Sequence, residues 1–393
     1  MTVPYITGVE LAGDATRPLL LVGPSLGTSA TSLWTSVAEL VGEDFHVIGW
    51  NLPGHGGAPG SEPFTMAELA AGVLAYARTI LDTRGAAERT FTYAGDSVGG
   101  AVGLQLTLDD PDAISAAVLL CTGARIATPE SWRERAATVR ASGTSAILTA
   151  AAARWFAPGF LDRSPEVASA LLHSLRDTDA EQYALACDAL AGFDLRARLP
   201  EVAIPVMAVA GRHDVVAPPS ALEQIADGVA NGRLVVLDDV GHLAPAEAPA
   251  TVARLLREHL LPSPNLREIR DAGMAVRREV LGDEHVDRVT AATTSFTRDF
   301  QELITLYAWG TIWTRPGLDR RSRSMITLTA LIARGHHEEL AMHVRAARSN
   351  GLSAEEIKEV ILQSAIYCGV PDANTAFRIA QRAIDEGSAP GAV

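Results

Sequence analysis

Cysteine and lysine are scarce in this chain of 393 residues, which has three cysteines and one lysine. Three isolated cysteines do not make a disulfide framework or a zinc site, and they favour a reducing compartment, so we expect a cytoplasmic protein. Since the one lysine is Lys358, lysine-based catalysis is excluded from the first part of the chain.

Long hydrophobic runs and an excess of positive charge are also missing. No apolar segment approaches the roughly 20 residues that span a bilayer, and the first residues lack the features of a signal peptide. The net charge of −14 disfavours nucleic acid and anionic membranes. We therefore expect small molecules as partners, with no nucleic acid and no membrane.

The charge is distributed unevenly along the chain. After Ser263, 16 Arg and Lys stand against 17 Asp and Glu, a net of −1, whereas the preceding part has 17 against 30, a net of −13. This asymmetry and the length of the chain indicate two domains. We predict a first domain at 1–261, a linker at 262–265 containing two prolines, a second domain at 266–387 and a flexible tail at 388–393.

A G-x-S-x-G motif occupies Gly95–Gly99. It follows an apolar segment, Phe91–Ala94, and precedes a helix-forming one, Ala101–Leu108. Strand, sharp turn and helix are the context in which this motif presents a nucleophilic serine, and its glycines leave room for the tight turn. Ser97 is therefore the candidate nucleophile.

Apolar segments alternate with helical ones through the first domain, which indicates a mostly parallel α/β sheet. The strands we predict are Leu19–Val22, Phe45–Trp50, Phe91–Ala94, Ala116–Leu120, Val206–Ala210 and Leu234–Leu237. Between about 125 and 199, helix-forming stretches replace the strands. We predict that these stretches form a helical cap over the carboxyl edge of the sheet.

Asp214 and His242 each follow a predicted strand, on the same sheet edge as Ser97. Singly, such an Asp is usually a turn former and such a His structural, but the order Ser, Asp, His is that of a hydrolase triad. His242 would take the proton of Ser97, and Asp214 would orient the imidazole.

Backbone N–H groups would stabilise the oxyanion that forms when Ser97 attacks. We expect these donors from Val98 and from Ser25 or Leu26, each stabilising the transition state by about 3 kcal/mol.

Four short motifs of the first part occur together in one family: Pro24–Thr28, Leu52–Gly56, Gly95–Gly99 and Gly211–Asp214. Through them the first part resembles the α/β-hydrolases, in particular the 3-oxoadipate enol-lactonases, over about residues 5–260. One residue departs from the family's pattern: Pro24 replaces an Asn, which leaves the backbone donors unaffected.

The second part is predicted to be all-α, because each of its segments carries an apolar stripe. The helices we predict are Arg267–Val280, Val286–Gly310, Arg321–Arg334, His336–Arg348 and Ala354–Cys368.

Four arginines lie within nine residues, Arg315–Arg323, and two tryptophans, Trp309 and Trp313, precede them. Such a cluster is either a solvated helix start or, against the apolar wall of the tryptophans, a site that grips small polycarboxylates. Trp309, Trp313, Arg315 and Arg323 are the candidate substrate-binding residues.

His336, Glu339 and His343 share one face of a predicted helix. The cluster lacks an obvious further ligand, so we predict no metal site. From spacing alone, a polar surface and an acid/base cluster remain equally open.

Five segments of the second part occur together in one family: Tyr307–Gly310, Trp313–Asp319, Arg323-Ser324, Glu339–His343 and Ile366–Pro371. Through them the second part resembles the carboxymuconolactone decarboxylases over about residues 266–386. The peroxidase-like members of that superfamily use C-x-x-C-x3-H, but His336 and Glu339 occupy the cysteine positions here, so thiol peroxidase chemistry is excluded.

The double resemblance implies successive reactions on dicarboxylate lactones. Decarboxylation of 4-carboxymuconolactone leaves a dienolate, needs no cofactor, and gives the 3-oxoadipate enol-lactone that Ser97 would open. The alternative is a hydrolase for another small ester, with a helical domain that only oligomerises or binds protein. We also expect a homo-oligomer that forms through the helical domain.

Overall fold

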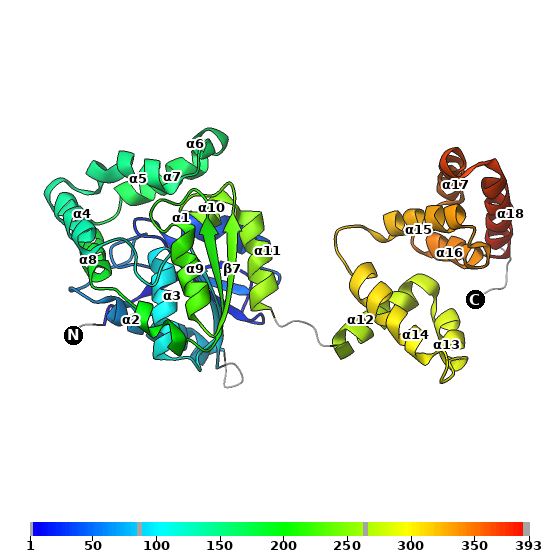
Figure 1. The fold of residues 1–393 in the computed structure, drawn as a ribbon, viewed down its shortest axis with the longest axis horizontal. Coiled ribbons are helices and arrows are strands. Elements are labelled where there is room, and N and C mark those ends of the chain that lie inside the picture. The colour runs from blue at the N-terminus through cyan, green and yellow to red at the C-terminus, as the bar shows by residue number, and fades with distance from the viewer. Residues whose placement is uncertain (1–2, 85–88, 262–265, 388–393) are drawn as a thin grey trace. The chain divides into compact units, whose positions relative to one another are not determined.

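The computed structural model describes residues 3–84, 89–261 and 266–387. The chain divides into two compact units, Met1–Pro262 and Ser263–Val393 (Figure 1). The expected linker at 262–265 and tail at 388–393 lie outside the described residues, so both stay predictions.

The first unit is built on a seven-stranded sheet with the strand order β1-β3-β2-β4-β5-β6-β7. All neighbouring strands are parallel except β1, which pairs antiparallel with β3. The strands are β1 (Thr7–Ala12), β2 (Leu19–Gly23), β3 (His46–Asn51), β4 (Phe91–Asp96), β5 (Ile114–Leu120), β6 (Pro205–Gly211) and β7 (Asn231–Leu237).

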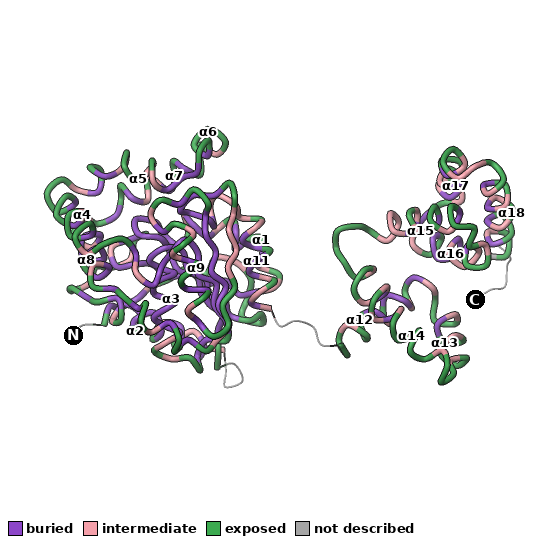
Figure 2. The backbone as a smooth tube through the Cα atoms, viewed as in Figure 1, coloured by how far each residue is buried: buried purple, intermediate pink, exposed green. Residues whose placement is uncertain are grey.

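The central strands are buried throughout, as the purple core of Figure 2 shows. Strand β1 was not predicted, because it is a largely exposed edge strand without an apolar run. Two helix pairs, α1 with α11 and α2 with α3, pack beside the sheet. The helices of this part are α1 (Ala30–Val41), α2 (Met66–Thr83), α3 (Val98–Asp109), α9 (Pro219–Gly228), α10 (Ala244–Glu247) and α11 (Pro249–Leu260).

A run of helices between β5 and β6 corresponds to the expected cap. The two ends of this run meet where the Leu195 N–H donates to the Ala124 carbonyl at 2.8 Å. Gln182 of the run also forms two hydrogen bonds with the backbone of Ser61, which precedes α2. Its elements are α4 (Pro129–Ser142), η1 (Thr144–Ile147), α5 (Leu148–Trp155), α6 (Phe160–Arg163), α7 (Pro165–Arg176), α8 (Ala180–Ala191) and η2 (Arg196–Glu201).

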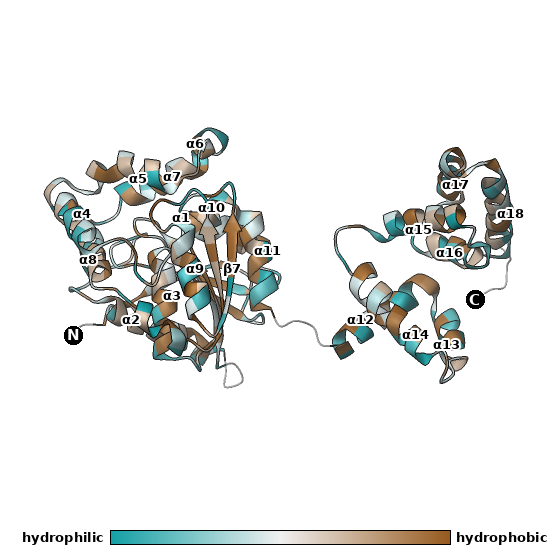
Figure 3. Ribbon diagram, in the orientation of Figure 1, coloured by the Kyte–Doolittle hydropathy of each residue, from teal (hydrophilic) through white to brown (hydrophobic). Residues whose placement is uncertain are grey.

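The described part of the second unit is helical. Hydrophobic and hydrophilic residues alternate along its helices, whereas hydrophobic residues concentrate on the strands of the first unit (Figure 3). Its elements are α12 (Leu266–Leu281), α13 (Asp283–Ala291), α14 (Arg298–Ile304), the π-helix η3 (Thr305–Trp313), α15 (Arg320–Arg334), α16 (His337–Ser349), α17 (Ala354–Cys368) and α18 (Val370–Gly387).

The prediction of one continuous helix over Val286–Gly310 was wrong. The chain leaves the helix after Ala291, and the Thr297 hydroxyl accepts a hydrogen bond from the Thr294 N–H at 3.0 Å. Threonine side chains compete in this way with helical hydrogen bonds. None of the helices in the described residues is long and apolar enough to cross a membrane.

Candidate active sites

Ser97 occupies the sharp turn between β4 and α3. Its φ of 54° and ψ of −114° are strained for a residue with a side chain. The turn demands glycine on both sides, since a Cβ on Gly95 would lie 2.3 Å from the Gly99 carbonyl oxygen, and one on Gly99 would lie 2.6 Å from the Gly23 carbonyl carbon. The G-x-S-x-G motif thus forms the geometry that its spacing predicts.

The buried side chains of Ser97, His242 and Asp214 form a hydrogen-bonded chain. The Ser97 hydroxyl donates to His242 Nε2 at 2.9 Å, and His242 Nδ1–H donates to Asp214 Oδ2 at 2.8 Å. The other oxygen of Asp214 accepts the N–H groups of Val216 and Ala217, at 2.7 and 3.0 Å. These bonds fix the carboxylate, which in turn fixes the imidazole so that Nε2 faces the serine.

Two backbone N–H groups beside Ser97 are available as oxyanion donors. The Ser25 N–H donates to the Thr28 hydroxyl at 3.1 Å, which leaves Leu26 as the candidate on that loop. No acceptor among the described residues takes the N–H of Leu26 or of Val98, the first residue of α3. The Gly99 N–H donates to the Pro24 carbonyl at 2.9 Å and holds the two donor segments together.

Glu247 is a residue of this site that the motifs did not reveal. Its Oε1 accepts the N–H groups of Gly241 at 3.0 Å and Leu243 at 3.4 Å, on either side of His242, and its Oε2 accepts that of Ala157 in the cap at 2.8 Å. Burial raises the pKa of Glu247, and these N–H bonds oppose the rise. One carboxyl group thus ties the His242 loop to the cap.

In the helical unit, the π-helix η3 brings Trp309 and Trp313 together, with ring centroids 5.1 Å apart. A π-helix is rare and often marks a functional site. It packs closely on α12, because a Cβ on Gly273 would lie 2.5 Å from the Thr305 carbonyl oxygen. Trp309 is buried in a small apolar cluster with Val276 and Val280 of α12, and Trp313 packs against that cluster, so contact of the two tryptophans with substrate stays a prediction.

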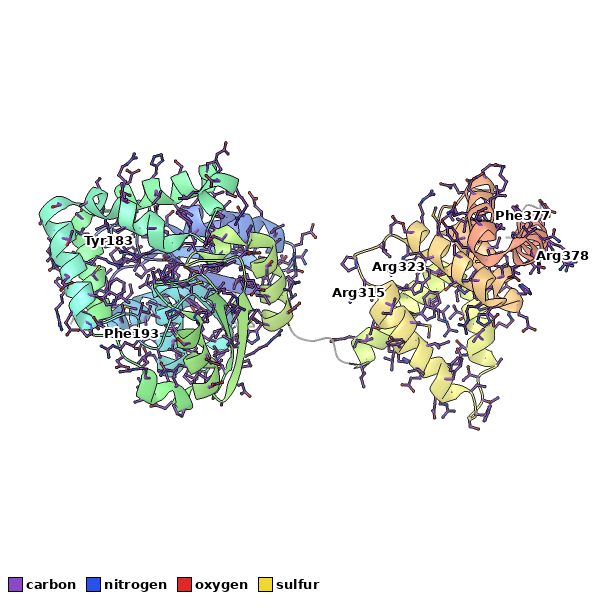
Figure 4. The ribbon with its side chains drawn as sticks, turned by 45° about the horizontal axis from the view of Figure 1, so that its top comes forward. Tyr183, Phe193, Arg315, Arg323, Phe377 and Arg378 are labelled. Carbon is purple, nitrogen blue, oxygen red and sulfur yellow. The ribbon has the colours of Figure 1, made fainter. Side chains whose placement is uncertain are left out.

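Three of the four arginines that follow η3 contact other protein groups through their side chains. Arg320 donates to Glu279 at 3.1 Å and to the Trp313 carbonyl at 3.0 Å, and Arg321 pairs with Glu356. Arg323 donates to the carbonyl oxygens of Leu318 at 3.1 Å and Arg315 at 2.7 Å, and the two arginines lie near each other in Figure 4. Binding of carboxylate by Arg315 and Arg323 stays a prediction.

Of the three candidate acid/base residues, His336 and Glu339 are exposed and His343 is half-buried. Burial lowers the pKa of His343, the carboxylate of Glu339 opposes this, and His285 of α13 lowers it further. His285 thus acts electrostatically on His343. Within the described residues, no three His, Cys, Asp or Glu side chains group in a way that could hold a metal ion.

The fold and the serine turn define the class. Residues 18–249 match the model of the alpha/beta hydrolase fold family, and residues 298–382 match that of the carboxymuconolactone decarboxylase family. The chain belongs to the α/β-hydrolases and carries a carboxymuconolactone decarboxylase domain in its second part, which confirms the fusion expected from the sequence.

Each of the two parts of the chain is similar in sequence to enzymes of known name. The chain is 33% identical over 238 residues to 3-oxoadipate enol-lactonase 2 of Acinetobacter baylyi, covering 60% of this chain and 86% of the relative. Over 119 residues it is 44% identical to 4-carboxymuconolactone decarboxylase of the same organism, covering 30% of this chain and 89% of the relative. A nitrosuccinic acid decarboxylase of Metarhizium robertsii is 45% identical over 120 residues, covering 30% of this chain and 84% of the relative.

Among solved structures, the enol-lactonase from Burkholderia xenovorans superposes on 64% of this chain and 95% of its own, with a TM-score of 0.60 and 28% identity. The hydrolase unit is thus similar to enol-lactonases in both sequence and fold.

Proposed function

We propose that this chain is a bifunctional enzyme that decarboxylates 4-carboxymuconolactone to 3-oxoadipate enol-lactone and then hydrolyses that lactone to 3-oxoadipate. One observation carries the proposal: a hydrogen-bonded Ser-His-Asp arrangement and a decarboxylase domain lie on one chain. The enol-lactone that decarboxylation produces is the substrate of the hydrolysis. The similarity to a nitrosuccinic acid decarboxylase does not by itself separate substrates, but the fused enol-lactonase-like unit favours the lactone.

Hydrolysis uses Ser97 as nucleophile and His242 as general base. The serine hydroxyl gives its proton to Nε2 as its oxygen attacks the lactone carbonyl, and the N–H groups of Leu26 and Val98 receive the oxyanion. Asp214 stabilises the imidazolium that forms. His242 then returns the proton to the departing enolate oxygen and activates the water that releases 3-oxoadipate.

Two cap arginines are suited to the carboxylate of the enol-lactone. Among the described residues, neither Arg135 nor Arg154 forms an ion pair with a carboxylate. Burial and then the charge of Arg135 lower the pKa of Arg154, and both arginines act electrostatically on Tyr183. Tyr183 packs against the oxyanion loop, since a Cβ on Gly27 would lie 3.3 Å from its Cε2 (Figure 4 labels Tyr183). A substrate carboxylate would relieve the repulsion between the arginines.

A Glu247→Gln variant is expected to hydrolyse enol-lactone roughly tenfold more slowly in kcat, with KM nearly unchanged, because an amide supports the N–H groups beside His242 less well than a carboxylate. Steady-state kinetics over a range of pH measure this effect. The matched control is Glu258→Gln, an exposed residue paired with Arg254. Equal rates for both variants would assign Glu247 a purely structural role.

In the helical unit, the substrate loses CO₂ from the carbon that is vinylogous to its lactone carbonyl. The electron pair of the breaking bond moves into that carbonyl and forms a dienolate, which is then protonated on carbon. His343, the half-buried member of its cluster, supplies the proton, and the tryptophans of η3 provide an apolar wall that favours departure of neutral CO₂.

Both activities are expected to survive chelation. Prolonged dialysis against EDTA should leave each rate within twofold of the untreated enzyme, because the proposed steps use side chains and backbone N–H groups only. The same preparation is assayed before and after dialysis with each lactone. A loss of decarboxylation that zinc or manganese restores would instead make His336, Glu339 and His343 metal ligands.

The helical unit is also the candidate surface for a homo-oligomer. Large apolar side chains are exposed on it, among them Phe296, Ile366, Tyr367 and Val370, which are 93%, 77%, 80% and 74% exposed. A second copy would bury exposed apolar side chains of this kind. Sedimentation of the full chain tests this, and a monomer at micromolar concentration would reject it.

The experiment that tests the function supplies each lactone separately to the full chain. We expect CO₂ release from 4-carboxymuconolactone and ring opening of the enol-lactone. The alternative function, a hydrolase with a non-catalytic helical module, predicts ring opening without any CO₂ release.

A further inference from the structure

The helical unit buries a guanidinium that the decarboxylase mechanism above does not use. Arg277 of α12 is only 5% exposed. Its Nη1 donates to the Thr305 hydroxyl at 3.3 Å and its Nη2 to Gln301 Oε1 at 3.0 Å, and both partners are neutral. Among the described residues, its buried Nε–H has no hydrogen-bond partner, and no carboxylate lies in ion-pair contact with the side chain.

An arginine in this state lacks what a buried cation ordinarily has. A guanidinium carries five N–H donors, and only two acceptors contact this one. Burial lowers the pKa of Arg277, with no opposing carboxylate to raise it. Buried charges are normally paired, because desolvation of an isolated ion is costly. The missing partner of Arg277 is therefore an anion.

The side chain lines a cavity large enough for such an anion. The cavity has a volume of about 510 Å³ and lies between α12, α13 and α14. Two further arginines, Arg270 and Arg298, line it together with a single carboxylate, Glu302, so positive charge predominates. Thr290 and Thr293 also line the cavity, and their hydroxyls donate to the carbonyl oxygens of Val286 at 2.7 Å and Val289 at 2.9 Å. Such a lining suits a small carboxylate, which can accept two parallel N–H bonds from a guanidinium.

Arg277 and the proposed proton donor, His343, lie on helices that pack against each other, α12 and α16. Helix α12 packs against both η3 and α16. The charge of Arg277 acts on His285, and His285 in turn acts on His343. An anion held by Arg277 would thus lie in the same electrostatic neighbourhood as His343.

We propose that Arg277, held by Gln301 and Thr305, binds a carboxylate of the substrate that the helical unit decarboxylates. The inference rests on the proposed function and adds a binding residue to it. Arg320, Arg321 and Arg323 already contact protein carboxylates or carbonyl oxygens, whereas among the described residues Arg277 has only neutral partners. Arg277 lies in a plain amphipathic stretch, so no sequence motif marks it.

The test compares Arg277→Met and Arg277→Lys with a matched control, Arg278→Met, in the full chain. Arg278 is the neighbouring residue, but its side chain is more exposed and pairs with Asp283 and Asp287 at 2.8 and 2.6 Å. We expect both Arg277 variants to lose at least about 100-fold in kcat/KM for decarboxylation. Methionine removes the charge, and lysine keeps the charge but cannot form the two parallel hydrogen bonds of a guanidinium with a carboxylate. The control should stay within threefold of the wild type, and enol-lactone hydrolysis should not change in any variant.

A stability readout separates binding from folding. Replacing an unpaired buried cation with methionine should not lower the melting temperature, so a functional loss without a stability loss supports the proposal. The second readout uses adipate as a dicarboxylate probe. Adipate should raise the melting temperature of the wild type and of Arg278→Met but not that of Arg277→Met.

These readouts also separate this inference from the function on which it rests. If the wild type releases no CO₂ from 4-carboxymuconolactone but the adipate shift depends on Arg277, the proposed decarboxylation fails and the anion site stands. If decarboxylation and the adipate shift are the same in Arg277→Met as in the wild type, the anion site is rejected.

Discussion

A Ser97→Ala variant is expected to lose at least about 10⁴-fold in enol-lactone hydrolysis while it decarboxylates 4-carboxymuconolactone at the wild-type rate. Alanine removes the nucleophile but keeps the turn, because methyl and hydroxymethyl side chains fit the same space. The three residues of the proposed triad all lie in the first unit, so the chemistry of the second unit should not depend on them. The enol-lactone should therefore accumulate.

The accumulation is measured by following the two lactones and 3-oxoadipate by NMR. A Thr122→Ser variant is a suitable control. The Thr122 hydroxyl donates to the backbone carbonyl of Ser97 at 2.7 Å, and a serine hydroxyl can make the same bond, which does not involve the Ser97 side chain. Hydrolysis by Ser97→Ala clearly above the spontaneous rate would reject the triad. Loss of both activities would show instead that the two units depend on each other.

A His343→Asn variant is expected to lose about 10²- to 10³-fold in kcat for decarboxylation, with hydrolysis unchanged. Asparagine keeps a polar side chain at this half-buried position but cannot deliver a proton. The matched control is His337→Asn on the same helix, since His337 lines a cavity with Arg378 and Arg382 of α18 to which His343 does not belong. Equal decarboxylation rates in the two variants would remove His343 from the mechanism.

The pH dependence follows from the environment of His343. Its burial, together with His285, lowers its pKa below the ordinary 6.5, and Glu339 opposes this. A proton donor must be protonated at the start of its step, so kcat for decarboxylation should be highest at pH values below that lowered pKa and should fall as pH rises through it. The His343→Asn variant should lack this dependence, and a profile shared with the wild type would contradict the assignment.

Much of the hydrolase site could be predicted from the sequence, because each of its parts is local. The turn at Ser97 follows from the glycines around it, and Asp214 and His242 each follow a strand, so a parallel sheet brings them to one edge. Glu247 could not be predicted in this way. Glu247 accepts backbone N–H groups from the cap and from the His242 loop, and no sequence motif indicates that these two segments lie side by side.

The helical unit was predicted less completely. Apolar stripes indicate its helices, but the break after Ala291 depends on threonine hydroxyls whose competition with the helix has no periodic signal. The arginines at 315–323 are conspicuous by density, whereas Arg277 becomes notable only when its burial and its neutral partners are known. The sequence therefore indicated the arginines at 315–323 as carboxylate-binding residues, whereas burial in the structure indicates Arg277.

The most direct test of the account supplies 4-carboxymuconolactone alone to the wild-type chain and measures CO₂ and 3-oxoadipate together over time. The account predicts one CO₂ and one 3-oxoadipate for every lactone consumed, with the enol-lactone present only transiently and no second protein added. Consumption without CO₂, or CO₂ release with enol-lactone as the lasting product, would contradict the claim that one chain performs both steps.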